Sequence, residues 1–213
     1  MSDPNDVIPD ERPQRRREYT GSGSTLGVGV LIILVVGVAI WWFEFRTTNP
    51  GGIAAEGIGI VELPVAMNPT GQPPAAQEGR AAPNYVLMTP GGGRASLTDY
   101  RGKYVLVNFW ASWCPPCRGE TPDLQRFSES HPDDIVVLGV NIQQSEADAQ
   151  GFLDQFDVTY PILLDVDGEV TDTYRAGYPP TSYLVGPKGE ILRLYTGVLT
   201  PEMLDELAAE YFT

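Results

Sequence analysis

The stretch from Val105 to Glu120, VLVNFWASWCPPCRGE, constrains the fold of this chain more than any other. Its first six residues are almost continuously apolar and rich in β-formers, which is typical of a strand buried on both faces in a parallel-type sheet. Prolines are tolerated in the first turn of a helix, because the N–H groups there have no intrahelical partner. The stretch therefore predicts a strand that runs directly into a helix, with Cys114 at the helix N-terminus.

Cys114 and Cys117, the chain's two cysteines, are spaced to lie one helical turn apart on the same side, within reach of a disulfide. Free N–H groups and the helix dipole favour a thiolate at Cys114, which makes it the candidate nucleophile. Cys117, further in and less exposed, is the candidate resolving cysteine. A structural disulfide would close too short a loop to constrain the unfolded chain, and a structural zinc needs more ligands than these cysteines and the lone His131 provide. We expect a redox site without cofactor or metal.

Several motifs in the right order carry a resemblance to a known family. FWASWCPPC with a later Pro-Thr resembles the thioredoxin superfamily, within the wider group of AhpC/TSA-type redoxins. The surrounding motifs are similar to those of the membrane-anchored TlpA/ResA-like thiol-disulfide oxidoreductases: APNYVLMTPGGGRASLTDYRGKYVLVNFW, the GETP after the second cysteine, and YPPTSYLVGPKGEI. The resemblance covers residues 82–213. It implies an α/β thioredoxin fold with an N-terminal β-hairpin and a central β-α insertion.

The resemblance also implies roles for individual residues. Glu120 matches the active-site glutamate of ResA-like proteins and would accept a proton during resolution, since Asn108 stands where thioredoxin itself carries a buried acid. The alternative is that Glu120 is a solvated acid in the first helical turn. The residues expected to contact substrate are Trp113, Pro115, Pro116, Pro179, Pro180 and Thr181.

Pro180, before Thr181, matches the proline that this family keeps in the cis form beside its CxxC motif, where a substrate strand can pair with the backbone. The preceding residue is Pro179, which has no N–H, where the family usually offers a donor. Backbone pairing with a substrate is therefore expected to be weaker here.

The N-terminal third of the chain differs in composition from the rest. From Leu26 to Phe43 it carries no charge, and about 18 to 20 residues rising ~1.5 Å each can cross a hydrocarbon core of roughly 30 Å. Arginines gather before this run, which places the N-terminus in the cytoplasm. A cleaved signal peptide is the alternative, but the run is long and ends in Trp-Trp-Phe-Glu. We expect a cytoplasmic tail at 1–25, a transmembrane anchor at 26–45, a flexible linker at 46–81 and a thioredoxin-like domain at 82–213.

Within residues 82–213, periodicity and turn residues predict alternating strands and helices. Strands are expected at 85–88, 95–97, 105–110, 135–141, 161–164, 182–185 and 191–196, and helices at 114–127, 145–156, 169–174 and from Pro201 onward. A further short strand is a candidate at 57–65. Ser145 and Thr200 are expected to cap their helices.

Charge and motifs together leave three classes of function. The formal net charge of −14 argues against non-specific nucleic-acid binding. The first class, which the resemblance implies, is an extracytoplasmic reductant of disulfides in exported proteins such as apocytochrome c, supplied with electrons by a membrane thiol donor of the CcdA/DsbD type. The second is a disulfide oxidase or isomerase, or a peroxide-handling redoxin, although a peroxiredoxin needs threonine where Ala111 stands. The third is a metal carrier that uses CxxC as a soft site.

Overall fold

The structure is a computed structural model, and it describes residue 36 and residues 57–212. The predicted tail, all of the predicted anchor except Val36, and the first part of the predicted linker lie outside the described residues. Within the described part of the chain, no helix combines the length and apolarity that a membrane span requires.

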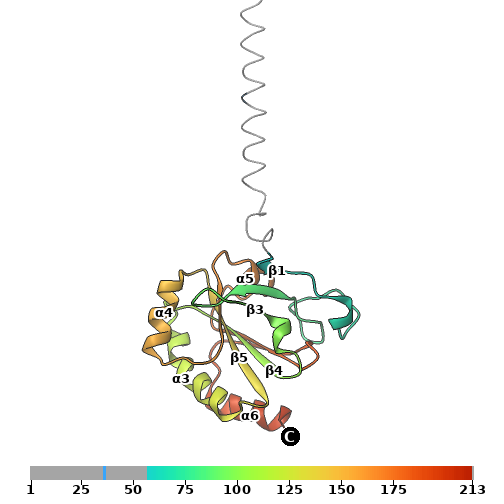
Figure 1. The fold of residues 1–213 in the computed structure, drawn as a ribbon. Helices are drawn as coiled ribbons and strands as arrows, with labels where there is room; N and C mark the ends of the chain where they lie inside the picture. Colours follow the sequence, from blue (N-terminus) through green and yellow to red (C-terminus); the bar gives the residue numbers. More distant parts are fainter. Residues whose placement is uncertain (1–35, 37–56, 213) are drawn as a thin grey trace, which may run out of the picture. The chain divides into compact units, whose positions relative to one another are not determined.

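A mixed eight-stranded sheet forms the centre of residues 57–212 (Figure 1). Its order is β1-β2-β6-β5-β4-β7-β8, and β3 pairs with β2 outside this path. The pairs β4–β5 and β5–β6 are parallel, whereas β7 and β8 close one side as an antiparallel pair. The strands are β1 (Gly59–Ile60), β2 (Tyr85–Met88), β3 (Arg94–Ser96), β4 (Tyr104–Trp110), β5 (Ile135–Ile142), β6 (Ile162–Asp165), β7 (Thr181–Val185) and β8 (Ile191–Thr196).

Helices cover both faces of this sheet (Figure 1). They are α3 (Pro115–Ser130), α4 (Glu146–Gln155), α5 (Glu169–Thr173) and α6 (Pro201–Tyr211), with two 3₁₀ helices, η1 (Val65–Met67) and η2 (Leu97–Tyr100). The predicted caps are confirmed: Ser145 accepts the N–H of Asp148, and Thr200 accepts the N–H of Met203. These caps satisfy N–H groups that have no partner inside their helices.

Two apolar cores lie on opposite faces of the sheet. One holds buried side chains of α3, α4 and α6, including Leu124, Phe152 and Leu204. The other holds side chains of β2, η2 and α5, including Tyr85 and Val170. Strand β4 contributes alternate residues to the two cores, which is why its sequence is apolar almost throughout.

The predicted elements and the expected thioredoxin-like α/β architecture are confirmed, with small shifts at the boundaries. Strand β3 ends at Ser96 because Ser96 caps η2 in a capping box with Asp99, so Leu97 begins a helical turn instead of ending the strand. Helix α3 continues to Ser130, one turn beyond the predicted end at Phe127. Between α3 and β7 the chain passes through β5, α4, β6 and α5.

The predicted boundary between linker and domain is wrong for residues 57–81, which belong to the folded unit. Strand β1 pairs with β2, and Ala81 forms an isolated antiparallel bridge with Glu190. The N–H of Gly79 donates to the carbonyl of Ile191 at 2.8 Å. The glycines and prolines of this segment therefore shape a strap along the domain, because its backbone finds partners on the edges of the sheet.

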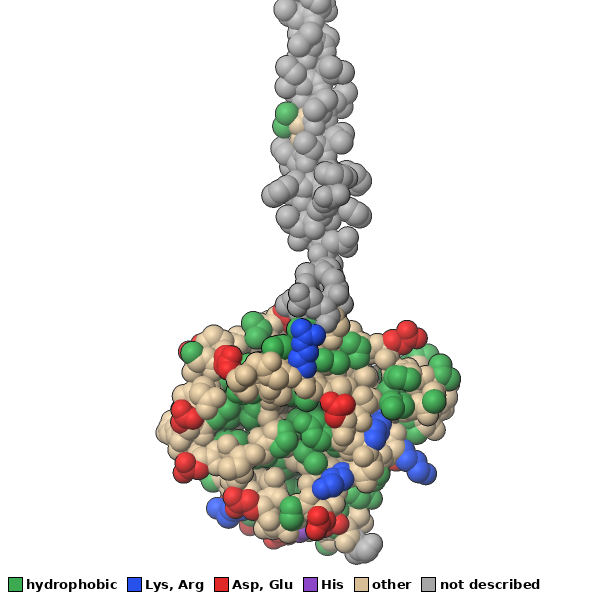
Figure 2. All heavy atoms as spheres, viewed as in Figure 1, with side chains coloured by type: hydrophobic (Ala, Val, Ile, Leu, Met, Phe, Trp, Pro, Cys, Tyr) green, Lys and Arg blue, Asp and Glu red, His purple; other side chains and the backbone are tan. Residues whose placement is uncertain are grey.

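The charged side chains on the face shown in Figure 2 are dispersed, with acidic groups interspersed among single basic ones. That face carries no gathered basic patch of the kind that binds nucleic acid. It agrees with the acidic balance of the whole sequence, 28 Asp and Glu against 14 Lys and Arg.

Candidate active site

The two cysteines form a disulfide at the start of α3, with an S–S distance of 2.08 Å. Cys114 is the N-cap residue, and its Sγ accepts the backbone N–H of Cys117 at 3.2 Å. The difference in exposure between the two residues is small in this oxidised state, 2% for Cys114 and 0% for Cys117. The N–H contact is what distinguishes the two sulfurs, because it would stabilise negative charge on Cys114 in the reduced protein.

The loop before Cys114 is held by Gln144, which follows β5. The Oε1 atom of Gln144 accepts the N–H of Ser112 at 2.7 Å, and its Nε2 donates to the Ser112 hydroxyl at 2.7 Å. Trp113 is 62% exposed, and Pro115 and Pro116 are also exposed. The disulfide is therefore buried beneath a rim of exposed apolar side chains on a braced loop.

The loop before β7 lies against the disulfide. The Pro179–Pro180 peptide bond is cis, and the carbonyl oxygen of Pro179 lies 3.5 Å from Cys114 Sγ. In the disulfide that sulfur carries no proton, so the contact becomes a hydrogen bond only when Cys114 is a thiol. The Thr181 hydroxyl donates to the carbonyl of Tyr178 at 2.9 Å, which closes the loop on itself.

Glu120 is a buried carboxylate, with 1% of its surface exposed, and is not a solvated acid. It lies one turn after Cys117 on α3, so the two side chains share a face of the helix. Asn108 Nδ2 donates to its Oε1 at 2.8 Å, and the N–H of Leu199 donates to its Oε2 at 3.0 Å. Asn108 Nδ2 also contacts Ser182 Oγ at 3.0 Å. Strand β4 and the residue before the N-cap of α6 therefore hold this carboxylate, and β7 holds the Asn108 amide.

Burial governs the protonation of Glu120. Desolvation raises its pKa to about 7, opposed by the hydrogen bonds from Leu199 and Asn108 and assisted by the charge of Asp123. A carboxyl group with this pKa exchanges protons near neutral pH, which suits a general acid or base. The same carboxylate contributes to raising the pKa of Tyr160, after that residue's own burial.

Sequence reasoning missed the donors that hold Glu120. Comparison with thioredoxin marks Asn108 only as a missing acid, although a single amide within an apolar strand is itself a signal that a buried polar partner exists. Leu199 and Gln144 gave no such signal, because the first acts through its backbone N–H and the second through a loop contact.

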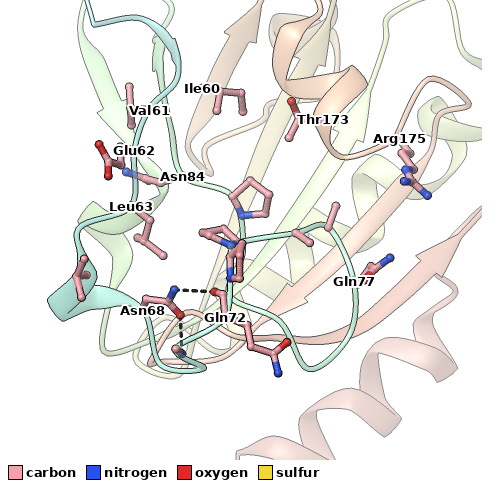
Figure 3. Close-up of a pocket in the computed structure, with 17 residues that line it drawn as sticks. Ile60, Val61, Glu62, Leu63, Asn68, Gln72, Gln77, Asn84, Thr173 and Arg175 are labelled. Carbon is pink, nitrogen blue, oxygen red and sulfur yellow. Dashed lines mark hydrogen bonds between the residues drawn. The ribbon is translucent and has the colours of Figure 1, made fainter.

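A cavity of about 670 Å³ lies between the strap and the segment that follows α5 (Figure 3). Its lining includes Leu63, Pro83 and Thr173, and Figure 3 shows Arg175 and Gln77 on the side opposite Glu62 and Leu63. No sulfur lines it, so it is separate from the redox pair. Within the described residues, no group of three or more His, Cys, Asp and Glu side chains could hold a metal ion.

The sequence profile of the AhpC/TSA family matches residues 79–193, which is more than half of the 213 residues. The chain belongs to the AhpC/TSA family. The match contains the cysteine pair, Glu120 and the cis-proline loop.

Curated relatives place it near one branch of the AhpC/TSA family. It is 38% identical to the thioredoxin-like protein YneN of Bacillus subtilis over 133 residues, covering 61% of this chain and 78% of the relative. It is 34% identical to the thiol-disulfide oxidoreductase ResA of the same organism, covering 61% and 73%, and 36% identical to its sporulation thiol-disulfide oxidoreductase A, covering 64% and 85%.

Solved structures agree with this placement. A thiol:disulfide interchange protein DsbE from Chlorobium tepidum is 28% identical with a TM-score of 0.59, covering 64% of this chain and 96% of that one. StoA from Bacillus subtilis is 35% identical with a TM-score of 0.51, covering 58% and 94%. This AhpC/TSA member is therefore a thiol-disulfide oxidoreductase of the ResA type with a thioredoxin-like fold.

Proposed function

We propose that this oxidoreductase reduces disulfides of exported proteins, among them apocytochrome c, from the outer face of the cell membrane. One observation supports Cys114 as the attacking cysteine: the N–H of Cys117 donates to Cys114 Sγ at the start of α3. In the reduced protein this contact and the helix N-terminus favour the Cys114 thiolate, which is the nucleophile in disulfide exchange.

The first step is attack by the Cys114 thiolate on one sulfur of a substrate disulfide. The substrate S–S bond breaks, a mixed disulfide forms, and the other substrate sulfur leaves as a thiolate that takes up a proton. The carbonyl of Pro179, 3.5 Å from Cys114 Sγ, lies beside the position of the new bond. Trp113, Pro115 and Pro116 form the exposed rim that the substrate contacts, with Pro179, Pro180 and Thr181 on the facing loop.

The second step is resolution by Cys117. Its thiol loses a proton and attacks Cys114 Sγ, which breaks the mixed disulfide, releases the second substrate sulfur as a thiolate and leaves the disulfide seen here. Two electrons pass to the substrate. Glu120 is the proposed acceptor of the Cys117 proton, because it is buried on the same helix face and its pKa is about 7.

The proposed location follows from the sequence outside the described residues. The uncharged run from Leu26 to Phe43, preceded by arginines, supports an anchor at 26–45 with the N-terminus in the cytoplasm and the domain outside. A reductase placed there needs electrons, which supports a membrane thiol donor of the CcdA/DsbD type as its partner.

Trapping tests the assignment of the two cysteines. The Cys117→Ala variant should accumulate mixed disulfides with exported proteins, whereas Cys114→Ala and the double variant should accumulate none. The matched controls separate chemistry from folding, since each variant removes the same internal disulfide. Equal trapping by the two single variants would show that the assignment is wrong.

The direction of electron flow is tested by the reduction potential of the pair. A value well below that of glutathione, with reduction of insulin disulfides, supports the reductase, and every ~30 mV corresponds to about 1.4 kcal/mol. A value near those of strong oxidants would instead make the protein an oxidase. Stable Cu(I) binding without insulin reduction would make it a metal carrier.

A further inference from the structure

A second cleft, of about 530 Å³, lies next to the cis-proline loop. Its lining comes from the strap at residues 76–78, from Arg175 and Tyr178, and from the facing ends of β7 and β8. Tyr178 is 92% exposed and directly precedes Pro179, whose carbonyl contacts the reactive sulfur. A substrate bonded to Cys114 therefore reaches this cleft with the residues that flank its own cysteine, at about 3.3 Å per extended residue.

The end of β8 offers this cleft backbone groups that β7 does not use. The N–H of Gly197 donates to Pro180, on the β7 side, whereas the N–H of Leu194 donates away from β7 to Glu78 Oε1 at 2.9 Å. Successive residues of a strand point their backbone N–H and C=O groups to opposite sides. The backbone groups of Thr196 therefore point to the same side as those of Leu194, away from β7. Thr196 lines the cleft, and its N–H and C=O lie on the side from which an extended peptide would pair with them.

Arg175 supplies the positive charge of the cleft. Its side chain is exposed, and among the described residues its guanidinium forms no hydrogen bond or ion pair, although its charge acts on the side chain of Tyr183, which also lines the cleft. Glu78 also lines the cleft, and its carboxylate already accepts the N–H of Leu194. Arg175 also lines the larger cavity of Figure 3, so it lies where the two hollows meet. A guanidinium without an ion-pair partner favours an anionic partner at short range, although the chain's net charge of −14 opposes anions at long range.

We propose that this cleft binds the extended segment of a protein substrate beside its reactive cysteine, and that Arg175 selects segments with an acidic side chain there. The inference rests on the proposed reduction of protein disulfides and adds a substrate preference to it. The peptide backbone pairs with Thr196, the Tyr178 ring covers it, and a substrate carboxylate pairs with the Arg175 guanidinium.

The test compares disulfide peptides that are identical except for Asp, Asn or Lys at one position flanking the cysteine, on each side in turn. At low salt, kcat/KM should be about two- to fivefold higher for Asp than for Asn, and lower still for Lys, as expected of an exposed ion pair. The preference should shrink at 0.5 M salt, where the Debye length falls to a few ångströms. Arg175→Gln should abolish it and Arg175→Lys should keep most of it.

Arg193→Gln is the matched control, because it removes the same charge from β8 at a guanidinium that pairs with Glu210 outside the cleft. It should leave the preference unchanged. A small uncharged disulfide, hydroxyethyl disulfide, should be reduced at equal rates by all these proteins, since it does not reach Arg175.

A binding measurement tests this inference independently of the proposed function. The same peptides with serine in place of cysteine are titrated into the oxidised protein, where no exchange can occur. If the Asp peptide binds more tightly and Arg175→Gln loses this difference, the result supports the proposed cleft. It does so even if no peptide is reduced, because failure of reduction rejects only the proposed reductase function. Equal binding and equal rates for the Asp and Lys peptides, or a preference that survives in Arg175→Gln, would overturn the inference.

Discussion

At the scale of single residues, Glu120 combines features that seldom occur together on a carboxylate. It is almost fully buried, no cation pairs with it among the described residues, and two N–H donors hold its oxygens. The donors stabilise its charged form, but desolvation outweighs them and raises its pKa to about 7. The result is a group that changes charge near neutral pH at a fixed place one turn from the resolving cysteine.

This raised pKa predicts a dependence of stability on pH. The folded protein binds the Glu120 proton more tightly than the unfolded chain, so the stabilisation is complete below about pH 4.5 and is lost as pH rises through about 7. Glu120→Gln should remove this dependence, which amounts to up to ~3 kcal/mol. Urea unfolding of the oxidised proteins at pH 5 and pH 8 measures it. Parallel loss of stability in both proteins across this range would contradict the assignment.

The same variant should also change the kinetics. A buried carboxylate disfavours further negative charge nearby and accepts a proton during resolution. In Glu120→Gln the decay of a preformed mixed disulfide should slow by about 10- to 100-fold, the range expected for loss of a general base. The pH profile of its rate should also shift, because the carboxylate titrates as one coupled set with the thiols. An unchanged pH profile would remove Glu120 from the mechanism.

At the scale of elements, the strap formed by residues 57–81 completes the domain. It adds β1 to β2, and it donates and accepts hydrogen bonds at Ile191, the first residue of β8. Ile58, Ile60 and Ala76 pack against the core that contains Tyr85 and Val170. The strap also contributes lining residues to both the larger cavity and the cleft beside the cis-proline loop. Its loss would therefore uncover apolar surface and free an edge of the sheet.

Truncation measures this contribution. A chain starting at Gly57 should unfold in urea like the full domain, whereas one starting at Ala82 should lose at least ~2 kcal/mol, because burial of apolar side chains outweighs the cost of ordering the strap. Formation of the Cys114–Cys117 disulfide in both chains is the control for a native-like active site. Equal unfolding midpoints would mean that the strap does not stabilise the domain.

At the scale of the whole molecule, the oxidoreductase domain is expected to act on the outer side of a membrane. A reporter fused after Thr213 should be active outside the cytoplasm, and the protein should remain in membranes after high-salt and carbonate washing, because an apolar span of about 20 residues is retained by the bilayer. Moving the arginines from before residue 26 to after residue 45 should weaken this orientation. Recovery of a soluble chain that starts beyond residue 45 would show cleavage instead.

The sequence by itself determined the strand–helix junction that carries Cys114, the capped helices and most strand boundaries. These features depend on local chemistry: apolar periodicity, prolines in a first turn and hydroxyl groups that accept nearby N–H donors. The motif spacing also indicates the family and its redox pair.

Only the tertiary structure decided the environment of the site. Glu120 receives hydrogen bonds from residues 12 and 79 positions away, and burial by distant elements sets its pKa. Likewise, the strap joins the domain because its backbone meets the free edges of strands far along the chain, although its composition is that of a linker. Arg175 likewise lines a cleft whose other lining residues come from distant parts of the chain. The burial of a side chain and the identity of its hydrogen-bond partners depend on long-range packing, which the spacing of residues along one segment does not encode.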